Sequence, residues 1–158
     1  MSTDTVVLQR RLLTQNWVDR SMNELIPNIR DAAEKAKIGD RDCELSPAQM
    51  SNLVGVAGDT RSVQVVISYI QYQVGRDSKN RKSWAWHGFG ETLVKELNGL
   101  QERAKGIVGS VGKEVQAPLQ SDAFKAEVDR VWMELTRHYL GHLRRYFMYR
   151  KPERGGSR

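Results

Sequence analysis

The sequence predicts an all-α protein, a single compact bundle of about five helices. Apolar residues recur at spacings of three and four in several long segments, whereas the apolar–polar alternation typical of strands is scarce. Glycine, proline and helix-capping residues separate these segments. A chain of 158 residues, of which 39% are hydrophobic, has the length and apolar content of one folded domain.

The first helical pattern covers residues 5–37 and contains Pro27. Proline either kinks a helix or occupies the first turn of a new one, so both one bent helix and two helices are compatible with this segment. A polar connector with Gly39 as the helix stop follows over residues 38–44.

The second helix is predicted to begin in the stretch LSPAQM, with Ser46 as its cap and Pro47 at its first helical position. It is expected to end near Gly58. Residues 63–74 carry apolar side chains on one helical stripe, and their β-branched content would also suit a strand. We favour a helix because the stripe continues for about three turns without alternation.

Two further helices are predicted over residues 91–108 and 121–151. Several glycines weaken the end of the first of these, and a mobile loop is expected over residues 109–120. Residues 1–151 are therefore expected to form one helical-bundle domain, and residues 152–158 a disordered basic tail.

Composition excludes several classes of protein. The chain contains no run of about 18 apolar residues, so we expect no membrane association through a spanning helix. Cys43 is the one cysteine, which excludes an intramolecular disulfide and a zinc site of the usual cysteine spacing. The N-terminus places its cations after a short apolar patch, the wrong order for a secretory signal. A cytoplasmic protein without a cofactor is expected.

Positive charge is concentrated in the second half of the chain. Residues 1–75 hold 8 Lys/Arg and 9 Asp/Glu, a net charge of −1, whereas residues 76–158 hold 17 and 10, a net charge of +7. Together these make the formal charge of +6. Such asymmetry indicates a polyanionic partner, although solubility alone is the simpler explanation.

Two groups of cations are the candidate RNA-binding residues. The first follows the third helix and comprises Arg76, Lys79, Arg81 and Lys82, with Tyr69, Tyr72, Trp84 and Trp86 as candidates for stacking on bases. The alternative is that the tryptophans pack on the core and the cations only solubilise a loop. The second group lies on the last helix and comprises Arg130, Arg137, Arg144 and Arg145. Three of its members are seven residues apart, about 10.5 Å along one line of the helix, a line that could follow a phosphate backbone or be an ordinary solvated face.

The histidines and glycines do not form a recognisable catalytic pattern. His138 and His142 are four residues apart and could meet one metal, but no third ligand is evident. His87 could be a general base for RNA cleavage but lacks a second catalytic partner. The stretch KGIVGSVGKEV departs from the phosphate-loop pattern, so no nucleotide-hydrolysis site is predicted. No catalytic residue and no metal ligand is assigned.

Three segments together resemble the small subunit of type III CRISPR effector complexes: LSPAQMSNLV, YIQYQVGR and VWMELTRHYLGHLRRYFMYRK. The likeness rests on Leu45, Ser46 and Asn52, on Tyr69, Tyr72, Gly75 and Arg76, and on Tyr139, Tyr146 and Tyr149. The loop over residues 77–90 and the glycine-rich segment before Pro118 depart from the pattern of the family.

The resemblance implies an all-α subunit without catalytic activity, stacked in several copies along the guide RNA–target RNA duplex. Its partners would be guide RNA, target RNA, the backbone subunits, the large signalling subunit and further copies of itself. Two alternatives stay open. The helix over residues 46–57 and the next one could form a helix-turn-helix DNA-binding regulator. A small ribonuclease would use His87, His138 or His142.

Overall fold

The computed structural model describes residues 2–151, which form five α-helices, one short 3₁₀ helix and no strand. The elements are α1 (Thr3–Lys35), α2 (Pro47–Asp59), α3 (Val63–Arg76), η1 (Trp86–Gly88), α4 (Phe89–Glu114) and α5 (Ser121–Arg150). The predicted all-α bundle is thus confirmed. The predicted basic tail, residues 152–158, lies outside the described residues.

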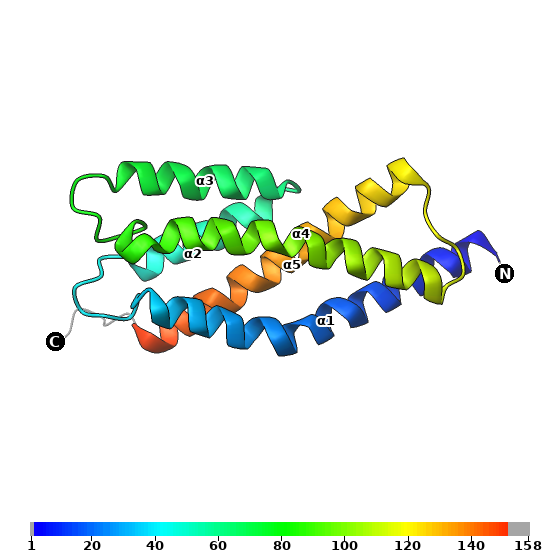
Figure 1. Ribbon diagram of the computed structural model, residues 1–158, viewed down its shortest axis with the longest axis horizontal. Coiled ribbons are helices and arrows are strands. Elements are labelled where there is room, and N and C mark those ends of the chain that lie inside the picture. Colours follow the sequence, from blue (N-terminus) through cyan, green and yellow to red (C-terminus); the bar gives the residue numbers. More distant parts are fainter. Residues whose placement is uncertain (1, 152–158) are drawn as a thin grey trace.

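Three long helices, α1, α4 and α5, extend along the molecule, and the shorter α2 and α3 cover one half of it (Figure 1). Helix α5 packs against α1, α2 and α4, whereas α3 lies on the outside and packs mainly on α4 and α2. The loops that follow α1 and α3 and the C-terminal end of α5 meet at the same end of the bundle (Figure 1).

Two prolines in this part of the chain have different effects on the helices, one inside α1 and one at the start of α2. Pro27 lies inside α1, which continues past it as one helix, so the two-helix alternative is wrong. Helix α2 begins with the predicted cap: Ser46 accepts a hydrogen bond from the Gln49 backbone N–H, and the Gln49 side chain accepts one from the Ser46 backbone N–H. This reciprocal capping box, with Pro47 at the first helical position, positions α2 beside α5.

The predicted mobile loop over residues 109–120 is wrong in its first half, because α4 continues to Glu114. Each exposed helical glycine costs about 1 kcal/mol relative to alanine, but burying one large aliphatic side chain contributes about 1.5–3 kcal/mol. Ile107, Val108 and Val111 are all buried, and their packing outweighs the low helix propensity. The connection to α5 is therefore short.

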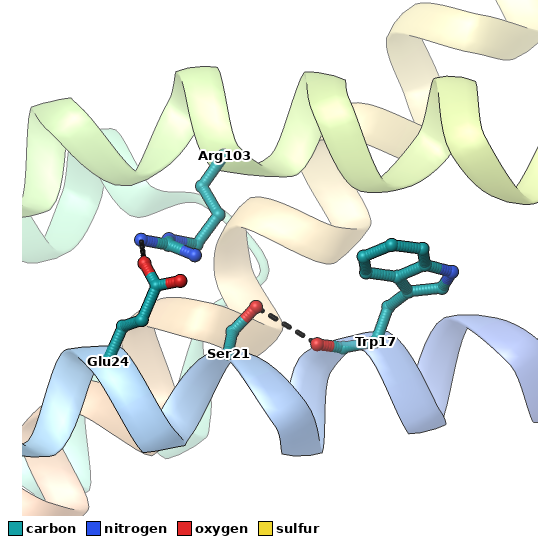
Figure 2. A network of polar contacts seen from close by, with 4 residues as sticks. All are labelled: Trp17, Ser21, Glu24 and Arg103. Atoms are coloured by element: carbon teal, nitrogen blue, oxygen red, sulfur yellow. Dashed lines mark hydrogen bonds and ion pairs between the residues drawn. The ribbon is translucent and has the colours of Figure 1, made fainter.

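Side chains on α1 and α4 also contact each other across the bundle (Figure 2). Arg103 on α4 donates to a carboxylate oxygen of Glu24 on α1 at 3.0 Å. One turn away, within α1 itself, the Ser21 hydroxyl donates to the Trp17 carbonyl at 2.9 Å. Exposed ion pairs of this kind contribute about 0–1 kcal/mol. The buried apolar side chains of all five helices, which form one cluster, hold the bundle together.

Candidate nucleic-acid interface

The loop between α3 and η1 is held in shape by one carboxylate. The backbone N–H groups of Ser83 and Ala85 both donate to the same carboxylate oxygen of Asp77, each at 2.8 Å. Between these two residues, the side chain of Trp84 is only 1% exposed, and its ring lies nearly parallel to that of Phe89, with ring centroids 6.3 Å apart. The loop is thus held by a buried aromatic side chain, and its backbone is fixed by hydrogen bonds.

The same loop is joined to the connector after α1. The backbone N–H of Glu44 donates to the Lys82 carbonyl at 2.6 Å, and the Trp86 indole N–H donates to the Lys37 carbonyl at 3.0 Å. The Ser83 hydroxyl also donates to the Gln49 side chain on α2 at 3.2 Å. Residues far apart in the sequence therefore form one surface at this end of the bundle.

Four exposed cations extend from this surface, and we call them the loop cations: Arg76, Lys79, Arg81 and Lys82. None of the four forms an ion pair with a carboxylate in the part of the chain that the structure describes. Cations on a fixed backbone lose little further backbone entropy on binding, so their arrangement suits contact with a polyanion.

The four candidate stacking residues differ in accessibility. Tyr72 is 62% exposed, and the Arg76 guanidinium lies 5.7 Å from the centre of its ring. Tyr69 and Trp86 are half-buried. Trp84 was predicted as a base-stacking residue, and its burial excludes that role in this fold, because no face of the indole is open to a base. The core interpretation is correct for this tryptophan.

The predicted arginine line on α5 does not form a free surface. The Arg130 guanidinium donates two hydrogen bonds to Glu127, both at 2.9 Å, and this contact raises the pKa of Arg130. Arg137 donates to the carbonyls of Ala57 and Thr60, at 2.9 and 2.7 Å, where α2 ends. The guanidinium satisfies carbonyl oxygens at a helix C-terminus, the end that favours positive charge.

Arg144 likewise faces α2, where its Nε donates to the Ser51 hydroxyl at 2.8 Å. Arg145 is exposed and points to neither of these contacts. Arg130, Arg137 and Arg144 therefore do not form a line of unpartnered guanidiniums, and their contact with phosphate stays a prediction. Helical spacing placed them correctly along α5, but it could not reveal that α2 would pack beside two of them.

A hollow of about 600 Å³ lies between α1 and α5, and we call it the α1–α5 groove. It is lined by Arg145 together with two arginines that were not predicted as site residues, Arg30 and Arg150. His142 also lines it, and burial, followed by the charges of Arg145 and His138, lowers the pKa of this histidine. The three arginines come from two helices, so no local pattern in the sequence could group them.

The three histidines do not converge. His87 is exposed beside Trp86 and lines a shallow hollow against α1, whereas His138 and His142 line a hollow on α5. Across residues 2–151, no three or more His, Cys, Asp or Glu side chains are grouped so that they could hold a metal ion.

The helix-turn-helix alternative can be compared with the arrangement of α2 and α3. These helices contact each other and run in opposite directions (Figure 1). The outer face of α3 exposes Val65 and Tyr72, and its one cation, Arg76, is the last residue of the helix. A recognition helix contacts bases through polar residues near its N-terminus, which this helix lacks apart from Gln64 and Ser68.

Comparisons with protein-family models, with curated proteins and with solved structures gave no match to the chain. Within the described residues, every helix is too short or too polar to cross a membrane.

Proposed function

We propose that this protein is a non-catalytic, RNA-binding subunit of a type III CRISPR effector complex, which stacks in several copies along the guide RNA–target RNA duplex in the cytoplasm. The chain's resemblance to the family motifs suggests the complex, and the loop cations suggest the contact with RNA. The backbone subunits, the large signalling subunit and further copies of the chain are the proposed protein partners.

One observation carries the proposal: four exposed cations, without ion-pair partners among the described residues, lie at the end of α3 and in the following loop, which Asp77 and Trp84 hold in place. A subunit of a guide-programmed complex must hold RNA of any sequence, and ionic contact with phosphates is independent of sequence. Of the four predicted α5 arginines, Arg130, Arg137 and Arg144 already donate hydrogen bonds to neighbouring groups, so they support the proposal less than the loop cations do.

The test replaces all four loop cations by glutamine in the assembled complex. Loss of four phosphate contacts should reduce the slope of log K against log salt concentration by about 3, since each contact contributes about 0.7–0.9. A matched control removes two arginines and two lysines that are exposed elsewhere on the bundle: Arg11, Arg61, Lys95 and Lys125.

RNA retention is measured over a series of salt concentrations, and circular dichroism checks that both variants fold. The proposal requires that the loop variant lose RNA at lower salt than the control variant does. If both variants retain RNA equally at every salt concentration, the loop cations do not contact RNA in the complex. Purification of the tagged chain from its host without guide RNA or backbone subunits would contradict the proposed complex.

A further inference from the structure

The α1–α5 groove combines an excess of positive charge with a hollow of the size of a small-molecule site. Its volume of about 600 Å³ lies within the range of about 300–1,000 Å³ typical of ligand pockets. Three arginines line it, Arg30 on α1 and Arg145 and Arg150 on α5, and Glu34 is the one acidic residue among the described residues that line it. Three guanidiniums against one carboxylate give the described lining of the groove a net positive charge, and none of the three forms an ion pair within residues 2–151.

Among the described residues, one acidic side chain lines the groove, that of Glu34, and it is already hydrogen-bonded. The Tyr146 hydroxyl donates to a carboxylate oxygen of Glu34 at 2.5 Å. A tyrosine hydroxyl is protonated at neutral pH and can donate, and burial followed by this hydrogen bond raises the pKa of Tyr146 further. Glu34 is thus turned toward the tyrosine, and the guanidiniums remain available to an added anion.

The position of Arg150 depends on a close approach to the connector after α1. A Cβ atom at Gly39 would lie 3.0 Å from the Arg150 Cβ and 3.3 Å from its Nε. A side chain at position 39 would therefore push against the arginine. The neighbouring Lys151 donates to the Cys43 carbonyl, which ties the end of α5 to the same connector. Arg150 is consequently placed by tertiary packing as well as by its helix.

An aromatic residue at the edge of the groove adds a second kind of contact. The Tyr149 ring is 78% exposed, and its centroid lies 6.2 Å from that of Tyr146. An exposed tyrosine beside arginines offers a face on which a nucleobase can stack. An inorganic anion would require only the guanidiniums, whereas a nucleotide would use both features.

We propose that the α1–α5 groove binds a nucleotide, with its phosphate between Arg30, Arg145 and Arg150 and its base on Tyr149. Two or three guanidiniums suit the dianion of a phosphate monoester, because each can donate two parallel hydrogen bonds. Such a ligand is either a free nucleoside monophosphate or the phosphorylated end of an RNA strand. The proposal does not depend on the proposed function, since the loop cations are not part of the groove.

The experiment is isothermal titration calorimetry of the purified full chain with the four 5′-nucleoside monophosphates. The unphosphorylated nucleosides and inorganic phosphate are titrated in parallel. We expect saturable binding of at least one nucleotide, weaker binding of phosphate, and none of the nucleosides. Absence of saturable binding of all four nucleotides up to millimolar concentration would overturn the proposal.

Variants then locate the site. Arg150→Gln and Arg30→Gln should each weaken nucleotide binding about tenfold, the loss of roughly one charged hydrogen bond. Arg61→Gln removes the same charge from an exposed position on the turn before α3 and should change nothing. The two groove variants lie on different helices, so one remains informative if the other unfolds. An equal loss of affinity in the Arg61 variant would show that binding depends on the overall charge of the protein, and it would contradict the assignment of the site to the groove.

The tyrosine and the source of the nucleotide are tested separately. Tyr149→Ala should weaken nucleotide binding several-fold but leave phosphate binding unchanged, and Tyr149→Phe should retain it. Short RNAs with a 5′-phosphate or a 5′-hydroxyl distinguish a strand end from a free nucleotide. Glutamine replacement of the loop cations should leave nucleotide binding intact, so failure here and failure of the proposed function are independent results.

Discussion

The loop cations and the arginines of α5 carry the same charge but have different surroundings. The loop cations are exposed and unpaired among the described residues, on a backbone held by Asp77. In contrast, Arg137 and Arg144 are directed into contacts with α2, and Arg130 is paired with Glu127. The difference shows that a regular line of arginines on a helix does not by itself indicate a binding surface, because a neighbouring helix can use the same donors.

The largest effect is expected where an arginine supports the fold. Arg137→Ala leaves the carbonyls of Ala57 and Thr60 without their donors. We expect the free energy of unfolding to fall by about 2–3 kcal/mol, since hydrogen bonds to charged groups contribute about 1.5–3 kcal/mol each and this site is only partly buried. Urea denaturation monitored by circular dichroism measures the change.

Arg145→Ala is the matched control on the same helix, and it should change the free energy of unfolding by less than about 0.5 kcal/mol. If both substitutions have the same small effect, Arg137 is a surface residue in solution, and the predicted arginine line regains its place as a candidate interface.

A smaller effect is expected in the loop. Asp77→Ala removes the acceptor of two backbone N–H groups and should lower the free energy of unfolding by about 2 kcal/mol. The amides of Ser83 and Ala85 should exchange with solvent faster, as hydrogen exchange measured by NMR would show. Asp42→Ala, at an exposed position in the neighbouring connector, is the control. Unchanged exchange at both amides would mean that Trp84 and the contacts with α2 and the connector after α1 order the loop without Asp77.

The smallest effect is expected for the single hydrogen bond from Arg144 to α2. Arg144→Ala should lower the free energy of unfolding by about 1 kcal/mol, because one partly buried hydrogen bond to the Ser51 hydroxyl is lost. A double-mutant cycle with Ser51→Ala isolates this pair, and a coupling of about 0.5–1 kcal/mol is expected. Additive single effects would show that Arg144 acts through general packing and not through this hydrogen bond.

Much of the fold could be predicted from local patterns. The apolar stripes of α3, α4 and α5 and the cap at Ser46 follow from helical periodicity and from the need of the first backbone N–H groups for acceptors. The length of α4 could not be predicted in the same way. Its glycines weaken the helix locally, and only the burial of residues such as Val111 against other elements compensates.

The candidate sites were also only partly predictable from the sequence. The position of the loop cations beside aromatic residues was evident in the sequence, but the separation of buried Trp84 from exposed Tyr72 was not. The α1–α5 groove was missed because Arg30 and Arg150 are 120 residues apart and meet only when the two helices pack. Periodicity within one segment contains no information about which residues of a distant helix will lie beside it.

The sequence alone determined the helical class of this protein, the beginning of α2 and the excess of positive charge after residue 75. These properties depend on neighbours within a few residues along the chain. Tertiary structure decided which cations are free, which cap a helix and which line a groove, because the partner of a long guanidinium side chain is set by whatever element packs next to it.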